Sequence, residues 1–70
     1  MHIGEIIQQK VKEKGMTVAG FAKILNCSRA NVYKIYAKYS IDTSVLKHIS
    51  KILEFDFFKL YSEELNNEKV

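Results

Sequence analysis

The fold is decided by the stretch Val18-Ala-Gly-Phe-Ala-Lys-Ile-Leu-Asn-Cys-Ser-Arg-Ala-Asn-Val-Tyr-Lys-Ile-Tyr36. Its apolar residues recur at helical spacing on both sides of a short turn at Asn26. Asparagine tolerates a positive φ better than other non-glycine residues, so Asn26 suits the end of a helix. Two helices joined by so short a turn must cross steeply, and Ala22 supplies the small side chain that a close crossing needs. The stretch therefore predicts crossed helices over residues 18–25 and 29–38.

One residue pattern indicates helix starts at four places. In each, a capping residue lies between an apolar residue and a second apolar residue four positions later, as in a hydrophobic staple. The four caps are Thr17, Ser28, Asp42 and Asp56. A further helix precedes them and ends at Gly15, which can adopt the left-handed conformation that closes a helix. The chain is thus predicted to form helices at residues 2–14, 18–25, 29–38, 43–54 and 57–62.

Composition limits what a chain of 70 residues can be. The hydrophobic fraction of 47% and the charged fraction of 27% are typical of a globular protein, and the chain is too short for a second core. We expect one domain over residues 1–61 and a frayed polar tail over residues 62–70. No membrane-spanning run or secretory signal is evident, which predicts a cytoplasmic protein.

The net charge of +3 is unevenly distributed. No acidic residue occurs between Glu13 and Asp42, and this window contains five lysine and arginine residues. The six remaining lysines against all eight acidic residues leave the rest of the chain at −2. An electropositive centre suits a polyanion such as nucleic acid, while cations that merely keep a small domain in solution explain the charge pattern equally well.

The third predicted helix presents to solvent a surface that suits DNA. Projected at about 100° per residue, Ala30 and Lys34 lie opposite its apolar side, with Tyr33 beside them. Arg29 points forward from its first turn. Arginine and lysine donate to guanine in the major groove, and alanine can contact the thymine methyl group. Arg29, Ala30, Lys34 and Tyr33 are therefore the candidate base contacts, with simple exposure as the alternative for Tyr33.

Phosphate contacts are expected around these base contacts. Free backbone N–H groups at the starts of the second and third helices, near Thr17 and Ser28, suit phosphate oxygens. Lys23 and Lys38 are the expected cationic contacts to the same DNA backbone. Such contacts would position the protein, while base contacts would give specificity.

Taken together, these residues resemble the helix-turn-helix of the phage-repressor-like (XRE) family of bacterial DNA-binding proteins. The likeness covers residues 3–61 and depends on Ala22, the turn at Asn26 and the apolar positions around them. It implies an all-α, compact five-helix bundle of the lambda-repressor-like type, in which helices two and three form the helix-turn-helix. It also implies that the third helix reads the major groove, with Arg29, Ala30 and Lys34 at positions that face base edges.

Three features depart from the family pattern. Val18 replaces a glutamine that in many members contacts DNA. Val11 and Tyr36 replace an arginine–glutamate pair, and because both positions are apolar together, the fold is expected to be intact. Ala37 and Lys38 replace the Asn-Gly of the following loop, which leaves Lys38 as the substitute phosphate contact.

The fifth predicted helix carries more aromatic surface than one short helix can hide. Phe57, Leu60 and Tyr61 take positions that are apolar in the family and are expected to close the core, whereas Phe58 replaces a usually polar residue. We expect Phe58, with Phe57 and Tyr61, to form the patch of a homodimer; a phenylalanine folded over its own helix is the alternative. A two-fold dimer would place two third helices about 34 Å apart on a pseudo-palindromic site.

The sequence does not favour an enzyme. There is no carboxylate pair in an apolar setting, no nucleophile–base constellation and no glycine-rich phosphate loop. Cys27 has only His2 and His48 as further soft ligands, without metal-ligand spacing, and is best explained as a small apolar residue in the turn. No metal, cofactor, small-molecule ligand or membrane is expected.

The favoured function is a sequence-specific DNA-binding transcriptional regulator that occupies an operator as a small homodimer and is nucleoid-associated when it is bound to DNA. The alternative is an antitoxin-like or degenerate helix-turn-helix module that binds another protein through the fifth helix and the tail, with DNA binding secondary or absent. Val18 slightly favours the alternative, and the window without acidic residues favours the regulator more strongly.

Overall fold

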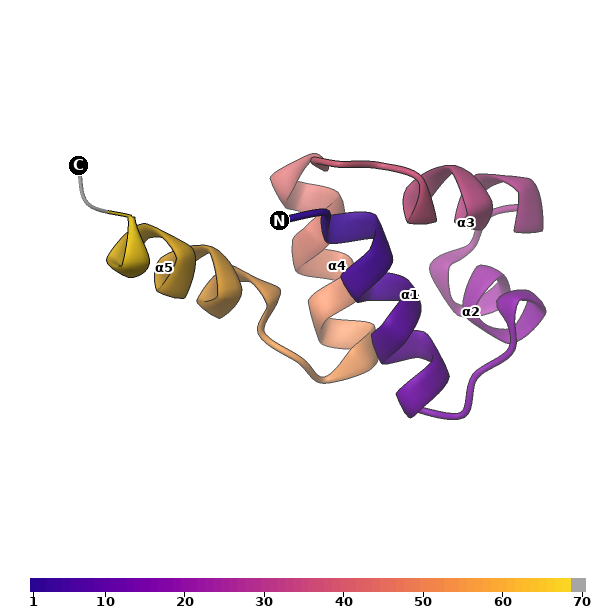
Figure 1. The fold of residues 1–70 in the computed structure, drawn as a ribbon. Coiled ribbons are helices and arrows are strands. Elements are labelled where there is room, and N and C mark those ends of the chain that lie inside the picture. The colour runs from indigo at the N-terminus through magenta and orange to yellow at the C-terminus, as the bar shows by residue number, and fades with distance from the viewer. Residues whose placement is uncertain (69–70) are drawn as a thin grey trace.

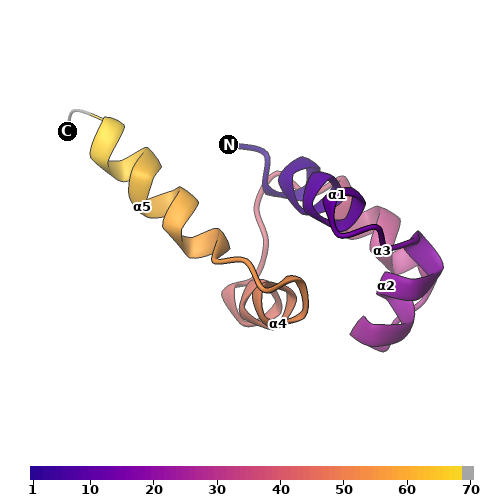
Figure 2. The ribbon, with the colours of Figure 1, turned by 90° about the horizontal axis from the view of Figure 1, so that it is seen from below.

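The computed structural model describes residues 1–68, which form five α-helices and no strand. The helices are α1 (Ile3–Glu13), α2 (Val18–Leu25), α3 (Arg29–Tyr36), α4 (Thr43–Leu53) and α5 (Phe57–Asn67). The pair α2 and α3 lies at one end of the molecule and α5 at the other, with α1 and α4 between them (Figure 1, Figure 2). The molecule is therefore elongated, 40 × 20 × 19 Å in extent. The predicted all-α fold is confirmed.

The four predicted helix starts are confirmed. At each, the side-chain oxygen of the cap accepts a hydrogen bond from a backbone N–H of the first turn, at 2.8–3.2 Å. These caps are Thr17, Ser28, Asp42 and Asp56, and the apolar residues on either side of them are buried or packed against the core. Hydrogen bonds from the side chain and backbone of Ser44 hold the pKa of Asp42 below its ordinary value.

A fifth cap, His2, was not predicted. Its Nδ1 accepts a hydrogen bond from the backbone N–H of Glu5 at 3.1 Å, and its ring lies edge-on to Tyr39 with the centroids 5.7 Å apart. Histidine is not among the residue types that commonly cap helices, so the sequence carried little signal for this role.

The helices α1, α2 and α4 end in the same way. A residue just after each helix adopts a left-handed conformation: Asn26 (φ 58°) and Glu54 (φ 50°) follow α2 and α4 directly, and Gly15 (φ 71°) follows α1 after Lys14. In each case the residue that follows the left-handed one donates its backbone N–H to the carbonyl five residues before it, at 3.0–3.1 Å, as in a Schellman motif. Gly15 and Asn26 were predicted for this role. Glu54 was not, because glutamate rarely adopts a positive φ.

The core is apolar: within residues 1–68 no polar or charged side chain is buried. It takes residues from all five helices, and its largest fully buried side chains are Phe21, Phe57, Ile3, Ile7, Leu46, Ile49, Leu53 and Val32. Phe57 joins α5 to the rest of the molecule, and its ring lies edge-on to that of Phe55 with the centroids 4.8 Å apart.

The backbones of α1 and α3 meet at Gly4. A Cβ atom on this residue would lie less than 3.0 Å from the backbone carbonyls of Ile35 and Tyr36. The N–H of Gly4 donates to the carbonyl of Lys38 at 2.9 Å, and that of Ile3 to the carbonyl of Tyr39 at 3.2 Å. The start of α1 is therefore bonded to the loop that follows α3.

Two predicted helix ends are wrong. The third helix ends at Tyr36 and not at residue 38. The fifth continues beyond residue 62 to Asn67, and the N–H of Glu68 donates to the carbonyl of Glu64 at 3.0 Å. Its polar composition suggested fraying, but no glycine or proline follows Phe57 to interrupt the helix. Residues 69–70 of the expected tail lie outside the described residues.

Replacing Gly4 with alanine tests the close approach of α1 and α3. We expect Gly4→Ala to reduce the free energy of unfolding by about 2 kcal/mol or more, because the new Cβ would collide with backbone atoms that cannot move aside locally. Chemical denaturation monitored by circular dichroism measures the change. The matched control is Gly20→Ala in α2, where the Cβ would meet only the Thr17 hydroxyl at 3.1 Å. A loss no larger than that of the control would contradict the packing described.

Replacing Glu54 with glycine tests the strain at the end of α4. We expect Glu54→Gly to raise stability by about 0.5–1 kcal/mol, because glycine adopts a φ of 50° without the steric cost that glutamate bears. The same change at Gln8, exposed within α1, should lower stability by about 1 kcal/mol. Thermal unfolding of both variants gives the two signs, and destabilisation by Glu54→Gly would show that the position is unstrained.

Candidate nucleic-acid interface

The turn between α2 and α3 fixes how the two helices cross. Asn26 reverses the chain with φ 58° and ψ 48°, and the N–H of Cys27 donates to the carbonyl of Ala22 at 3.0 Å. The side chain of Ala22 is only 3% exposed, as expected for the small residue where the helices meet. Ser28 then caps α3 at once. Hydrogen bonds within this turn end α2 and start α3, and the two helices lie together at one end of the molecule (Figure 1).

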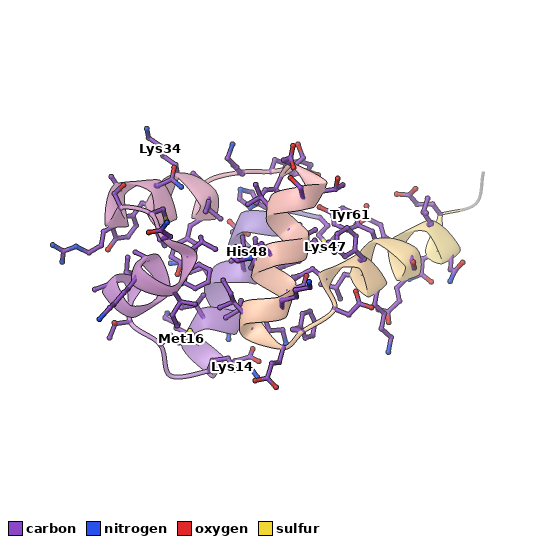
Figure 3. All side chains as sticks on the ribbon, turned by 180° about the vertical axis from the view of Figure 1, so that it is seen from behind. Lys14, Met16, Lys34, Lys47, His48 and Tyr61 are labelled. Atoms are coloured by element: carbon purple, nitrogen blue, oxygen red, sulfur yellow. The ribbon has the colours of Figure 1, made fainter. Side chains whose placement is uncertain are left out.

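The helix α3 has one buried side and one exposed side. Its inward residues are Val32, Ile35 and Tyr36, all at most 7% exposed. The predicted base contacts Arg29, Ala30, Tyr33 and Lys34 are all exposed. Figure 3 shows the side chain of Lys34 pointing away from the rest of the protein. The residues assigned to the groove-facing side therefore reach solvent together, and a helix of this shape can enter a major groove.

Tyr33 lies between the two sides of α3. Its side chain is 59% exposed, and its ring lies edge-on to that of Tyr36 with the centroids 6.3 Å apart. Burial raises the pKa of Tyr36, with a smaller contribution from Tyr33. Because most of the Tyr33 side chain is exposed, it is accessible to a partner.

Asn31 is a further exposed residue of α3 that was not predicted as a base contact. It is exposed in the first turn, and its backbone N–H is held by Ser28 at 3.1 Å. A side-chain amide carries a donor and an acceptor that match N6 and N7 of adenine. The signal was available, because Asn31 lies only about 60° around the helix from Lys34.

The predicted phosphate contacts Thr17, Ser28, Lys23 and Lys38 are all exposed. The hydroxyls of Thr17 and Ser28 accept hydrogen bonds from the N–H groups of Gly20 and Asn31, so they cap α2 and α3. By helix geometry the two N–H groups between each cap and its bonded residue have no intrahelical acceptor. These groups remain available to an anion.

The two lysines predicted to contact phosphate differ in position. Lys23 is exposed near the end of α2, away from Thr17 at its start. Lys38 is exposed in the loop after α3, one turn beyond Lys34, and its carbonyl is held by the N–H of Gly4 at 2.9 Å. The loop that carries Lys38 is thus anchored to α1.

The cations of this region have no acidic partner in the described part of the chain. The ion pairs found there are Lys10 with Glu13 at 3.2 Å and the N-terminal amine with Glu64 at 3.5 Å. Neither involves the basic residues of the window without acids, which are Lys14, Lys23, Arg29, Lys34 and Lys38. Their charge is therefore available to a polyanion.

The predicted dimer patch needs a correction. Phe57 is wrong as a member, because its side chain is 0% exposed and belongs to the core. Phe58 is 37% exposed, and Tyr61 is half-buried. Both line a groove between the start of α4 and α5. The expectation that Phe57 closes the core is confirmed, and its place in the dimer patch is not.

Residues 1–68 contain neither a metal-binding cluster nor a membrane-spanning helix. No cluster of three or more histidine, cysteine, aspartate or glutamate side chains there could hold a metal ion. Within the same residues no helix has both the length and the apolar character needed to cross a membrane. Cys27 is half-buried in the turn between α2 and α3.

Comparison with known proteins agrees with this geometry. A family model described as a Cro/C1-type HTH DNA-binding domain matches residues 7–58, which include α2, α3 and α4 in full. Searches of curated proteins and of solved structures found no match. The matched segment covers most of the chain and is centred on the crossed helices α2 and α3. The chain therefore belongs to the family of Cro/C1-type helix-turn-helix DNA-binding domains.

Proposed function

We propose that this protein is a sequence-specific transcriptional regulator that occupies an operator as a small homodimer, with α3 in the major groove. The observation that carries the proposal is the outward side of α3, where Arg29 and Lys34 are exposed, flank Ala30 and have no acidic partner in the described chain. Membership of a DNA-binding family supports the same reading.

The proposed base contacts follow from the chemistry of the exposed side chains. Arg29, at the first position of α3, can donate two parallel hydrogen bonds to O6 and N7 of guanine. Lys34 can donate to the same type of acceptor farther along the groove. Ala30 lets the helix backbone come close and can contact a thymine methyl group. Tyr33 adds a ring and a hydroxyl at the edge of this surface.

Phosphate contacts would set the orientation of α3. The free N–H groups beside Thr17 and Ser28 and the ammonium groups of Lys23 and Lys38 can bind phosphate oxygens on either side of the groove. Lys38 suits this role because hydrogen bonds hold its loop against α1. The contribution of these groups would be independent of sequence and would weaken with salt.

A homodimer would let so small a protein read a longer DNA site. A single α3 reads few base pairs, whereas two copies related by a two-fold axis read two half-sites about 34 Å apart. The exposed side of α5 around Phe58 and Tyr61 is the proposed contact. Occupancy of the operator would then depend on protein concentration.

A second candidate function is a protein-interaction module. It is favoured by the exposed apolar residues of α5, above all Leu65 at 65% exposure. In this case α5 would bind a different protein, and DNA binding would be secondary.

Selection and titration with DNA test the proposed function. We expect the wild type to enrich a motif from a randomised duplex library and to bind it with an affinity that falls steeply between about 50 and 200 mM salt. Arg29→Ala/Lys34→Ala should bind that motif at least about 30-fold more weakly, because base contacts of this kind contribute about 1–3 kcal/mol each. Fluorescence anisotropy measures both affinities.

A second double variant controls for charge alone. Lys12→Ala/Lys59→Ala removes the same charge from exposed positions on α1 and α5, and it should retain the selected motif with only a small loss of affinity. Equal losses in the two double variants would reject reading by α3. If the wild type enriches no motif and binds no duplex at moderate salt, the protein-interaction module becomes the better explanation.

A further inference from the structure

One side of α1 borders an apolar groove. The other wall of this groove is the turn between α4 and α5 together with the start of α5, and its volume is about 380 Å³. Ile6, Phe55 and Leu60 form the apolar lining, and all three are half-buried. The lining residues from α1 are Glu5, Ile6, Gln9, Lys10 and Glu13. They cover about 12 Å of helix, which is long enough for a short segment of a partner to lie along α1.

A second hollow continues this groove past Leu60. It has a volume of about 390 Å³, and Phe55 and Leu60 line both spaces. Its further lining residues are Glu54, Asp56, Lys59 and Glu63. We call the two hollows together the α1–α5 groove. Phe58 and Tyr61 line neither hollow, so the groove is separate from the proposed dimer contact.

The rim of the α1–α5 groove is acidic. Five of the eight acidic residues of the chain line it, together with two lysines. The acids are Glu5, Glu13, Glu54, Asp56 and Glu63, and the lysines are Lys10 and Lys59. Five negative and two positive charges leave the rim at −3, on a protein whose net charge is +3. The groove therefore favours a positively charged partner and repels DNA.

One ammonium group of the protein itself already lies at the groove. The Nζ of Lys10 is 4.2 Å from the centre of the Phe55 ring and 3.2 Å from Oε1 of Glu13. Hydrogen bonds from Lys10 and Gln9 hold the pKa of Glu13 below its ordinary value, so this carboxylate is ionised at neutral pH. An aromatic face beside a carboxylate is a favourable place for a cation. The flexible stem of Lys10 lets its ammonium group move aside and admit another cation.

From these observations we propose that the α1–α5 groove binds a basic segment of another protein. An aliphatic side chain of that segment packs against Ile6, Phe55 and Leu60. A lysine or arginine next to it lies over the Phe55 ring and pairs with Glu13, where Lys10 lies in the free protein. The groove is between α1 and α5, at a distance from the pair α2 and α3 (Figure 1, Figure 2). The partner can therefore bind while α3 is on DNA.

A second copy of this chain suits the groove less well. Its basic end, formed by α2 and α3, would have to enter the groove, and the side of α3 proposed to read DNA would then be covered. Such a head-to-tail contact also leaves one groove and one basic end free, so it leads to open chains and not to a closed dimer. A separate basic protein fills the groove without either consequence.

Titration of the full chain with a labelled synthetic peptide tests the proposal. The probe has about 12 residues, with one leucine flanked on both sides by lysines and alanine elsewhere. We expect fluorescence anisotropy to give a Kd of about 100 µM or lower at low salt, and a higher Kd as salt is added. The same peptide with glutamate in place of lysine, or with alanine in place of leucine, should bind at least about fivefold more weakly.

Two double variants test the acidic rim. Glu13→Gln/Glu63→Gln removes one carboxylate from each hollow and should raise the Kd of the probe by about tenfold. The matched control Glu64→Gln/Glu68→Gln removes the same charge outside the groove and should change the Kd by less than about twofold. Circular dichroism checks that each variant remains folded.

Two lysines of α1 test the position of the cation. Lys10→Ala should lower the Kd of the probe by about threefold or more, because it frees the Phe55 ring and the Glu13 carboxylate. The matched control Lys12→Ala removes the same charge from an exposed residue outside the groove and should change the Kd by less than about twofold. Equal effects of the two changes would contradict the placement of the partner's cation over Phe55.

The proposal is overturned if the probe does not bind, if the glutamate peptide binds equally well, or if the two double variants lose equal affinity. Open-ended association of the wild type in sedimentation, abolished by Glu13→Gln/Glu63→Gln, would make a second copy the occupant instead. The inference is independent of DNA reading, because Arg29→Ala/Lys34→Ala changes residues outside the groove and should bind the probe as the wild type does. A wild type that binds the probe but no duplex would reject the proposed function and keep this inference.

Discussion

The backbones of α1 and α3 approach closely at Gly4, and this contact sets the position of α3. Because Gly4 has no side chain, α1 can lie against the carbonyls of Ile35 and Tyr36. The first N–H groups of α1, which have no acceptor within their own helix, donate to the carbonyls of Lys38 and Tyr39. This contact fixes the end of α3 and the following loop against α1, and so gives the exposed side of α3 a defined direction.

Apolar packing, without any buried ion pair among residues 1–68, supports that contact. Val11 and Tyr36 are 3% and 7% exposed, and burial raises the pKa of Tyr36 so that its phenol stays neutral. A buried ion pair at these positions would bear a desolvation cost that an apolar pair avoids. Among residues 1–68 no basic side chain is buried, so the charge of these residues can act on a partner.

The two ends of the molecule differ in chemistry. The end formed by α2 and α3 is basic and exposes Arg29 and Lys34, whereas the end formed by α5 is aromatic and acidic. Because these ends lie at opposite sides of α1 and α4 (Figure 1), the proposed dimer contact leaves α3 free to bind DNA. The division explains how so small a chain has room for two interaction surfaces.

Features that depend on residues close together in the chain could be predicted from the sequence. The four caps, the left-handed Asn26 and the two sides of α3 each involve residues within a turn or two, so local chemistry predicts them. Packing between distant segments decided the rest. The role of Gly4 depends on the carbonyls of α3 that lie against it. The role of Glu54 depends on the left-handed conformation that it adopts at the end of α4. Phe57 and Phe58 are adjacent aromatics, and only the direction of α5 against α4 buries the first and exposes the second. Burial and strain depend on which elements meet, and that is a property of the whole folded chain and not of local propensity.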